Sequence, residues 1–160
     1  MTDKQEADKK YFPLFLDLSD KDILFVGGGA IASRRIHVLQ RFADRITVVA
    51  PEAEGSILEL TESGDVSWIM REFEEDDLEG RDIVFASTDD KELNADIAIE
   101  CRQRGITVNV SSDKDLCDFY FPGIVEQGET LIGVSASGKD HRKAKKVREK
   151  IQEILTEEEI

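Results

Sequence analysis

The sequence has few of the residues and runs that mark secreted, metal-binding or membrane proteins. Its 160 residues include two cysteines and two histidines. Cys101 and Cys117 stand apart, without a CxxC motif or a neighbouring pair of histidines, so we expect two buried thiols and neither a disulfide nor a metal site. No apolar run approaches the roughly 20 residues that span a bilayer. The first ten residues alternate in charge and lack an apolar centre, which predicts a cytoplasmic protein without a signal peptide.

Positive charge is also scarce over most of the chain. The formal net charge is −14, from 35 acidic and 21 basic residues. This balance argues against nucleic acid or an anionic membrane as a partner. The exception is residues 139–150, where seven basic residues and two acids give +5 and leave −19 for the rest of the chain. We therefore expect an anionic ligand to be attracted to this basic segment or to backbone amides.

Short apolar runs alternate with helical patterns up to about residue 110. Strands are predicted at residues 23–26, 46–50, 66–69, 82–87 and 107–110, and helices at 30–42, 54–63 and 92–104. The second strand is expected to end at Pro51. Strands that alternate with helices in this way predict βαβ units. The fold class is thus α/β, with a doubly wound parallel sheet of the Rossmann type.

The pattern changes after residue 111. Two strand-like runs, 119–125 and 130–135, are joined by a short polar turn and predict a hairpin. A final helix at about residues 142–155 places its apolar residues on one face and its basic residues on the other. We therefore divide the chain into a Rossmann domain, residues 1–113, and a smaller hairpin-plus-helix region, residues 114–160. The hairpin has more apolar surface than so small a region can bury alone, which predicts a homodimer.

A glycine-rich turn connects the first strand to the first helix. Residues 27–32, Gly-Gly-Gly-Ala-Ile-Ala, fit the pattern G-x-G-x-x-A. Gly27 allows the tight turn, Gly29 lets the backbone approach a pyrophosphate, and Ala32 permits close packing of helix on strand. The helix N-terminus adds amides and a partial positive charge for the phosphates. In this βαβ context the motif predicts a dinucleotide site that includes Gly27, Gly29, Ala30 and Ile31.

Two further strand ends are predicted to line the same site. An acid after the second strand normally binds the ribose hydroxyls, and here the sequence is Ala50-Pro51-Glu52, so Pro51 and Glu52 are the candidates. Acids without a neighbouring arginine favour NAD over its 2′-phosphorylated form, and the alternative is that Glu52 is a solvated loop residue. Ser87 and Thr88 follow the fourth strand, at the edge where ligands bind in such folds. That segment is also suited to capping the next helix, and the two roles are compatible.

Taken together, these stretches resemble the precorrin-2 dehydrogenases, the NAD-dependent module of siroheme synthases. The matching stretches are residues 12–15, 26–32, 48–51, 86–90 with Asn94, 105–110 and 116–122. Their order and spacing extend over about residues 11–150. The resemblance implies an oxidoreductase of siroheme and porphyrin biosynthesis that oxidises precorrin-2 to sirohydrochlorin and passes hydride to NAD. It further implies a homodimer in which the hairpin forms the intersubunit part, and some members also insert iron.

The sequence departs from the family pattern in three places. The family's catalytic aspartate falls on Ser112, and the next residue is Asp113. Asp113 is therefore the predicted acid/base residue, with a turn-capping role as the alternative. The serine-glycine-glycine turn before the last helix becomes Ser-Gly-Lys-Asp at residues 137–140. Many relatives also continue into a further helical domain, so we leave iron insertion open.

The resemblance implies a role for the basic segment in binding the substrate, because precorrin-2 carries many carboxylates. The predicted substrate-binding residues are Ser137, Lys139, His141, Arg142 and Lys143. A solvated helix face is the alternative interpretation of this segment. For the whole chain, the alternative is a non-catalytic protein of the same fold that binds NAD or carries a tetrapyrrole. A nucleotide-sensing regulatory domain of a transporter would share the glycine turn but fits the hairpin poorly.

Overall fold

The computed structural model describes residues 11–136 and 140–157. They form two compact units: the larger one spans Leu16–Tyr120, and the smaller one comprises the described residues on either side of it. In the described part of the chain, no helix combines the length and the apolar character that crossing a bilayer requires.

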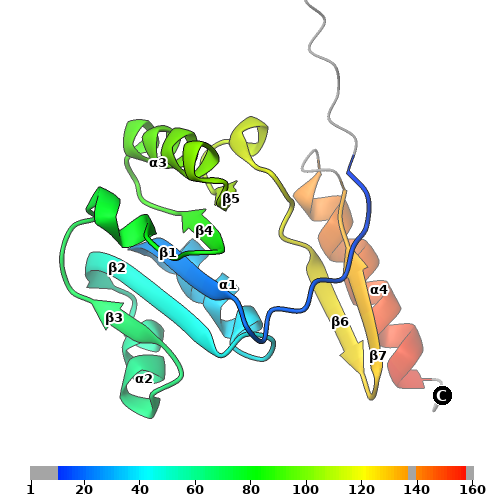
Figure 1. Cartoon of the computed structure of the whole chain (residues 1–160). Helices are drawn as coiled ribbons and strands as arrows, with labels where there is room; N and C mark the ends of the chain where they lie inside the picture. Colours follow the sequence, from blue (N-terminus) through cyan, green and yellow to red (C-terminus); the bar gives the residue numbers. More distant parts are fainter. Residues whose placement is uncertain (1–10, 137–139, 158–160) are drawn as a thin grey trace, which may run out of the picture. The chain divides into compact units, whose positions relative to one another are not determined.

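The larger unit contains a five-stranded parallel sheet. Its strands are β1 (Asp22–Gly28), β2 (Arg45–Ala53), β3 (Ser67–Ile69), β4 (Ile83–Ala86) and β5 (Thr107–Val110), in the spatial order β3-β2-β1-β4-β5 (Figure 1). This order confirms the predicted Rossmann-type sheet. The chain reverses its direction of winding between β1 and β4, and in such folds ligands bind at that point, outside the carboxyl ends of the strands.

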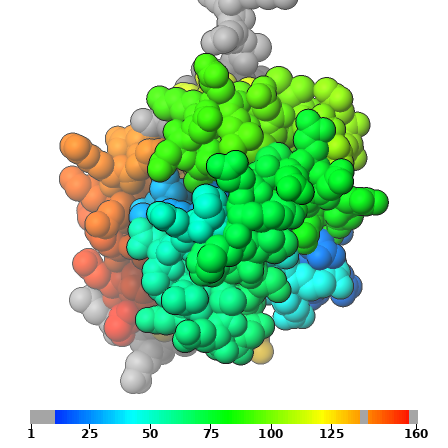
Figure 2. Space-filling model, turned by 90° about the vertical axis from the view of Figure 1, so that its left-hand side faces the viewer, coloured from blue at the N-terminus to red at the C-terminus, as the bar shows by residue number. Residues whose placement is uncertain are grey.

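Three α-helices and two short 3₁₀ turns connect the strands. They are α1 (Ala30–Leu39), α2 (Gly55–Ser63), η1 (Glu75–Leu78), α3 (Lys91–Arg104) and η2 (Lys114–Leu116). Helix α3 covers one face of the sheet, and α1 and α2 lie on the other (Figure 1). The outer strand β3 has three residues. When the molecule is seen from the β3 side of the sheet, the segment from α2 through η1 forms the middle of the visible surface (Figure 2). A short edge strand offers little backbone for unwanted pairing.

The packing of the core explains why the sequence of β1 contains a continuous apolar run. Ile23 to Val26 are all at most 1% exposed, because side chains from both faces of this central strand are covered. Leu24 and Val26 belong to the cluster that packs under α3. On the alternating positions, Phe25 stacks on Phe85 with ring centroids 4.4 Å apart. The predicted buried strand is therefore confirmed.

Strand β2 does not end at Pro51, which corrects the sequence expectation. The strand continues to Ala53, because Gly28 pairs with Ala53 after a register shift between Val26 and Gly28, at which β2 has the extra residues. Glu54 then donates its backbone N–H to Gly28 O at 2.9 Å. A proline can remain in a strand where its missing N–H is not needed for the ladder, as at an irregularity of this kind.

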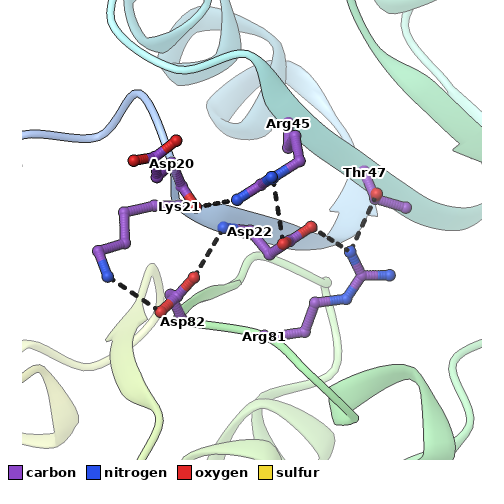
Figure 3. A network of polar contacts seen from close by, with 7 residues as sticks. All are labelled: Asp20, Lys21, Asp22, Arg45, Thr47, Arg81 and Asp82. Carbon is purple, nitrogen blue, oxygen red and sulfur yellow. Dashed lines mark hydrogen bonds and ion pairs between the residues drawn. The ribbon is translucent and has the colours of Figure 1, made fainter.

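The amino-terminal edge of the sheet is held by a network of ion pairs and hydrogen bonds (Figure 3). Asp82 accepts hydrogen bonds from Asp22 N at 2.9 Å and from Lys21 Nζ at 3.2 Å. Asp22 in turn pairs with Arg45 at 3.2 Å, and Arg81 donates to Thr47 Oγ1 at 3.2 Å. These contacts join the starts of β1, β2 and β4. The opposite, carboxyl-terminal edge is the one that carries the predicted ligand residues.

The smaller unit contains the predicted hairpin and the last helix. Strands β6 (Gly123–Gln127) and β7 (Thr130–Val134) pair antiparallel around Gly128, whose φ of 56° suits glycine, and α4 spans His141–Glu157. Helix α4 packs on β6, where a Cβ added to Gly123 would lie 3.0 Å from Arg148 Cδ. Among the described residues of this unit, Val125 is the one apolar side chain that is fully buried.

The change from one unit to the other comes at Tyr120, later than the boundary at residue 113 that the sequence suggested. The intervening segment packs along β5. Asp118 Oδ2 accepts a hydrogen bond from Val108 N, and Asn109 Nδ2 donates to Phe119 O, at 2.9 and 2.8 Å. These contacts bind residues 114–120 to the edge of the sheet, so they belong with the Rossmann unit.

Candidate functional site

Two of the three glycines at the end of β1 and the start of α1 are required by the fold itself. Gly27 has a φ of 103°, and a Cβ there would lie 2.5 Å from Ser87 O. A Cβ on Gly28 would lie 2.6 Å from Glu52 O. Both positions are therefore closed to any larger residue, because the turn is pressed between the ends of β4 and β2. A Cβ on Gly29, by contrast, would meet no atom within 4 Å.

Gly29 is also the N-cap of α1, and this helix begins without a side-chain cap. Its first turn contains no acidic residue. Helix geometry leaves the first N–H groups of the turn, including those of Ala30 and Ile31, without intrahelical partners. Helix α3 begins differently, because Asp90 accepts hydrogen bonds from Glu92 N and Leu93 N. An uncapped helix start with free space at Gly29 is suited to bind an anionic group.

The structure brings the predicted cofactor residues together from three strands. Ser87 O lies against Gly27, and Glu52 O lies against Gly28. Pro51 and Glu52 are exposed at the end of β2, and Ser87 and Thr88 begin the loop after β4. The residues present fit a dinucleotide, since open space at Gly29, helix amides and an acid near the end of β2 occur in one place. The assignment of the individual residues remains a prediction.

A fully buried asparagine ties two loops of this edge together. Asn94, in the first turn of α3, accepts hydrogen bonds at Oδ1 from Thr88 N and Thr88 Oγ1, at 3.1 and 2.7 Å. Its Nδ2 donates to Thr88 O at 2.9 Å and to Ser112 Oγ at 3.2 Å. In the sequence, Asn94 stood out only as part of the family resemblance, and no role was predicted for it. One signal was present, since Asn94 occupies a position on the same face of α3 as Ile97, Ala98 and Cys101, all of which are buried.

A second polar bridge lies on the other face of β4 and β5. Arg35, from α1, donates to Asn109 Oδ1 and Ser111 Oγ at 2.8 and 3.0 Å. Ser111 Oγ is 2.7 Å from Ser87 Oγ. The guanidinium also lies 5.6 Å from the centre of the Phe85 ring. Burial lowers the pKa of Arg35, but an arginine stays charged at any ordinary pH, so α1 brings a fixed positive charge to this edge.

Asp113 lies where the chain leaves β5. It is exposed, it caps the 3₁₀ turn η2, and its Oδ1 accepts a hydrogen bond from Asp115 N at 2.8 Å. The turn-capping contact that was the alternative for this residue is therefore present. A carboxylate can cap a turn and still meet solvent or substrate, so the acid/base role of Asp113 stays a prediction.

The predicted substrate-binding residues are only partly within the described structure. Ser137 and Lys139 lie outside the described residues. His141, Arg142 and Lys143 are exposed in the first turn of α4. Asp140 caps this helix, since its Oδ1 accepts from Lys143 N at 2.8 Å.

The two cysteines are buried free thiols, as predicted. Burial raises the pKa of Cys101 to about 11, so its thiol stays protonated. Cys117 Sγ lies 3.2 Å from both Val110 N and Val110 O. Over the described residues, no group of three or more His, Cys, Asp or Glu side chains could hold a metal ion.

These features define a dinucleotide-binding protein of the Rossmann type: a parallel sheet, a glycine turn at its switch point and an uncapped helix behind that turn. Comparison with known proteins agrees with this class. The model of a family described as "Putative NAD(P)-binding" matches residues 14–123. The chain belongs to this NAD(P)-binding family.

The chain is similar to siroheme synthases and to a solved precorrin-2 dehydrogenase. It is 39% identical over 145 residues to the siroheme synthase of Methylococcus capsulatus, and 36% identical over 145 residues to that of Photorhabdus laumondii. Each match covers 91% of this chain and 31% of the relative, so the chain spans about a third of the length of these proteins. The structure of "SirC, precorrin-2 dehydrogenase" superposes with a TM-score of 0.75 at 25% identity, over 90% of this chain and 70% of that one. These similarities confirm the resemblance and the fold inferred from the sequence.

Proposed function

We propose that this chain is an NAD-dependent dehydrogenase that oxidises precorrin-2 to sirohydrochlorin in siroheme biosynthesis. The observation that carries the proposal is the open, uncapped start of α1 at Gly29, in a chain similar to the matching part of siroheme synthases. The similarity to SirC supports the same reaction. The chain covers 31% of the length of the siroheme synthase of Methylococcus capsulatus, and our proposal concerns the oxidation step.

The chain's own residues would bind and orient the cofactor. Gly29 and the amides of Ala30 and Ile31 would hold the pyrophosphate, and Glu52 would accept hydrogen bonds from the ribose hydroxyls. The exposed Glu52 would repel a 2′-phosphate, which supports NAD over NADP. When bound, NAD supplies the chemistry of hydride acceptance. The protein's task is then to place the substrate and to remove a proton.

Asp113 is our candidate for the base that accepts that proton. Oxidation removes a hydride and a proton from the substrate, so a base is needed at the carboxyl edge of the sheet. Asp113 is an exposed carboxylate within the first turn after β5. Ser112 is a poor base by itself, because its hydroxyl does not ionise near neutral pH. Asn94 Nδ2 donates a hydrogen bond to Ser112 Oγ, and this amide group cannot accept the proton of the hydroxyl.

The first half of α4 is our candidate for binding the substrate's carboxylates. Cationic side chains cluster there, near the positive end of the helix, where they reduce its stability. A placement that opposes folding is readily explained by an anionic ligand. The described basic members of this cluster, all exposed, are Arg142, Lys143, Lys145 and Lys146, and His141 precedes them at the start of the helix.

We also propose a homodimer formed through the smaller unit. A two-stranded hairpin is marginally stable by itself, and in this unit Val125 is the one fully buried apolar residue described. Phe12, Leu14 and Phe15 are 86%, 69% and 71% exposed, which adds apolar surface to the same unit. Twofold pairing is the commonest way to cover such a surface. Sedimentation should give a dimer at micromolar concentration, and a clean monomer would contradict the proposal.

A cytoplasmic location completes the proposal, supported by two cysteines that are both free thiols. The alternative function is an NAD-binding or tetrapyrrole-carrying protein without turnover. Ser112 favours it, since the resemblance implies a catalytic aspartate at this position. Anaerobic incubation with precorrin-2 and NAD separates the two, because a carrier would bind both molecules without forming NADH.

A further inference from the structure

The loops after β4 and β5 share a single buried side chain. Asn94 is 0% exposed, and all the hydrogen-bonding capacity that its amide normally uses is engaged: two acceptor contacts at Oδ1 and two donor contacts at Nδ2. Three of these contacts are made to Thr88 in the loop after β4. The fourth reaches Ser112 in the loop after β5.

These partners lie at the functional edge of the sheet. Thr88 belongs to the predicted cofactor loop, whose preceding residue Ser87 lies against Gly27. Ser112 precedes Asp113, our candidate base. A buried polar group is costly unless its hydrogen bonds are made, so an asparagine on the apolar face of α3 needs both loops in place to be satisfied.

We propose that Asn94 is a positioning residue that sets the loop after β5 relative to the loop after β4. This inference rests on the proposed function. Asn94 holds Thr88 through backbone N–H, backbone carbonyl and hydroxyl, so the geometry of that loop is closely defined. From there its Nδ2 fixes Ser112, and with it the start of the turn that carries Asp113. The β5 loop is thereby aligned before the substrate arrives, which is how supporting hydrogen bonds raise catalytic rates.

The decisive experiment is a double-mutant cycle of Asn94→Ala and Ser112→Ala. We expect Ser112→Ala to lower kcat with precorrin-2 about tenfold, with the Kd for NAD within twofold of the wild type. Asn94→Ala should lower kcat at least as much and raise the Kd for NAD about fivefold, because it also releases Thr88. The double variant should be no slower than Asn94→Ala, since both changes remove the same contact.

Two further measurements keep the test independent of turnover and of general stability. Exchange of the Thr88 amide hydrogen, followed by NMR, should accelerate in Asn94→Ala, because that N–H donates to Asn94 Oδ1. Cys101→Ala is the matched control, since Cys101 is equally buried on the same helix, two turns away and outside the site. It should lower the unfolding temperature while leaving kcat and the Kd for NAD unchanged.

Several results would overturn the inference. One is a double variant whose losses multiply, because Ser112 would then act without Asn94. Others are a kcat within twofold of the wild type in Ser112→Ala, or a loss in Cys101→Ala equal to that in Asn94→Ala. If Asn94→Ala does not fold, the Ser112→Ala result still decides. If the wild type forms no NADH at all, the proposed function fails. The role of Asn94 is then tested by exchange of the Thr88 amide hydrogen and by the Kd for NAD.

Discussion

Replacing Gly29 with aspartate adds a carboxylate at the N-cap of α1, where the fold leaves the most room. The backbone at Gly29 has φ −78° and ψ −174°, an extended conformation that any residue can adopt and that N-caps typically have. No atom lies within 4 Å of the added Cβ. The side chain can therefore accept the hydrogen bonds of the first helical turn, which have no side-chain acceptor in the wild type.

The expected effect on stability is favourable. Aspartate is among the best N-cap residues, exceeding glycine by a few tenths of a kcal/mol. A negative charge at a helix N-terminus contributes a further 0.3–1 kcal/mol, roughly. The variant should thus be about 1 kcal/mol more stable than the wild type. Gly27→Ala should behave in the opposite way, because its Cβ would collide with Ser87 O at 2.5 Å in a backbone conformation that disfavours side chains.

The expected effect on cofactor binding is a large loss. The new carboxylate occupies the helix amides and stands close to the bound pyrophosphate. Two like charges about 4 Å apart repel by about 4 kcal/mol at an effective dielectric constant of about 20. That energy corresponds to about a thousandfold increase in Kd.

Calorimetry with NAD and thermal unfolding of the same samples would measure both effects. Gly29→Asn is the matched control, because asparagine caps as well as aspartate but adds no charge. It should lose roughly tenfold in affinity, because its side chain adds bulk and occupies the helix amides. A Gly29→Asp variant with wild-type affinity for NAD would refute the cofactor site. A variant with much reduced stability would refute the claim that a side chain fits at Gly29 without strain.

Three other predictions concern the base, the substrate and the fold. Asp113→Asn should lower kcat about a hundredfold or more with unchanged NAD affinity, and a rate within threefold of the wild type would remove Asp113 from the reaction. Replacing three lysines of α4, Lys143, Lys145 and Lys146, with glutamine should raise KM more than it lowers kcat, with a smaller effect at high salt. An unchanged KM would show that this helix face is a solvated surface. Asp77→Asn should cost about 2 kcal/mol of unfolding free energy, because Arg71 donates two hydrogen bonds, of 2.8 and 2.7 Å, to this nearly buried carboxylate. The hydrogen bonds from Arg71 lower the pKa of Asp77, so its stabilising effect is complete above the unfolded-state value of about 4 and disappears as the pH falls through the lowered folded-state pKa. Urea unfolding at pH 7 and below pH 3 should show that difference shrink, and a constant difference would contradict the charge-based explanation.

The features that could be predicted from the sequence are those that depend on neighbours along the chain. The apolar run of β1, the glycine turn and the hairpin around Gly128 each depend on a few consecutive residues. The end of β2 was predicted wrongly, because its last residue, Ala53, is held by Gly28 in another strand. Local patterns carry no information about such a pairing.

The polar contacts that support the site were missed for the same reason. Arg35 and Asn109 are 74 residues apart in the chain, and Asn94 and Ser112 are 18 apart. In the sequence, Arg35 looks like a surface residue of a helix and Asn94 like an interruption of an apolar face. Only the fold brings each of them to the ends of β4 and β5.

The most direct test of the account is anaerobic incubation of the wild type with precorrin-2 and NAD, with Gly29→Asp in parallel. We expect NADH and sirohydrochlorin to appear together, one for one, in the wild-type sample. Neither should form in the Gly29→Asp sample, although that protein is folded. NAD binding without any NADH would contradict the central claim and would identify a carrier or a binding protein in place of a dehydrogenase.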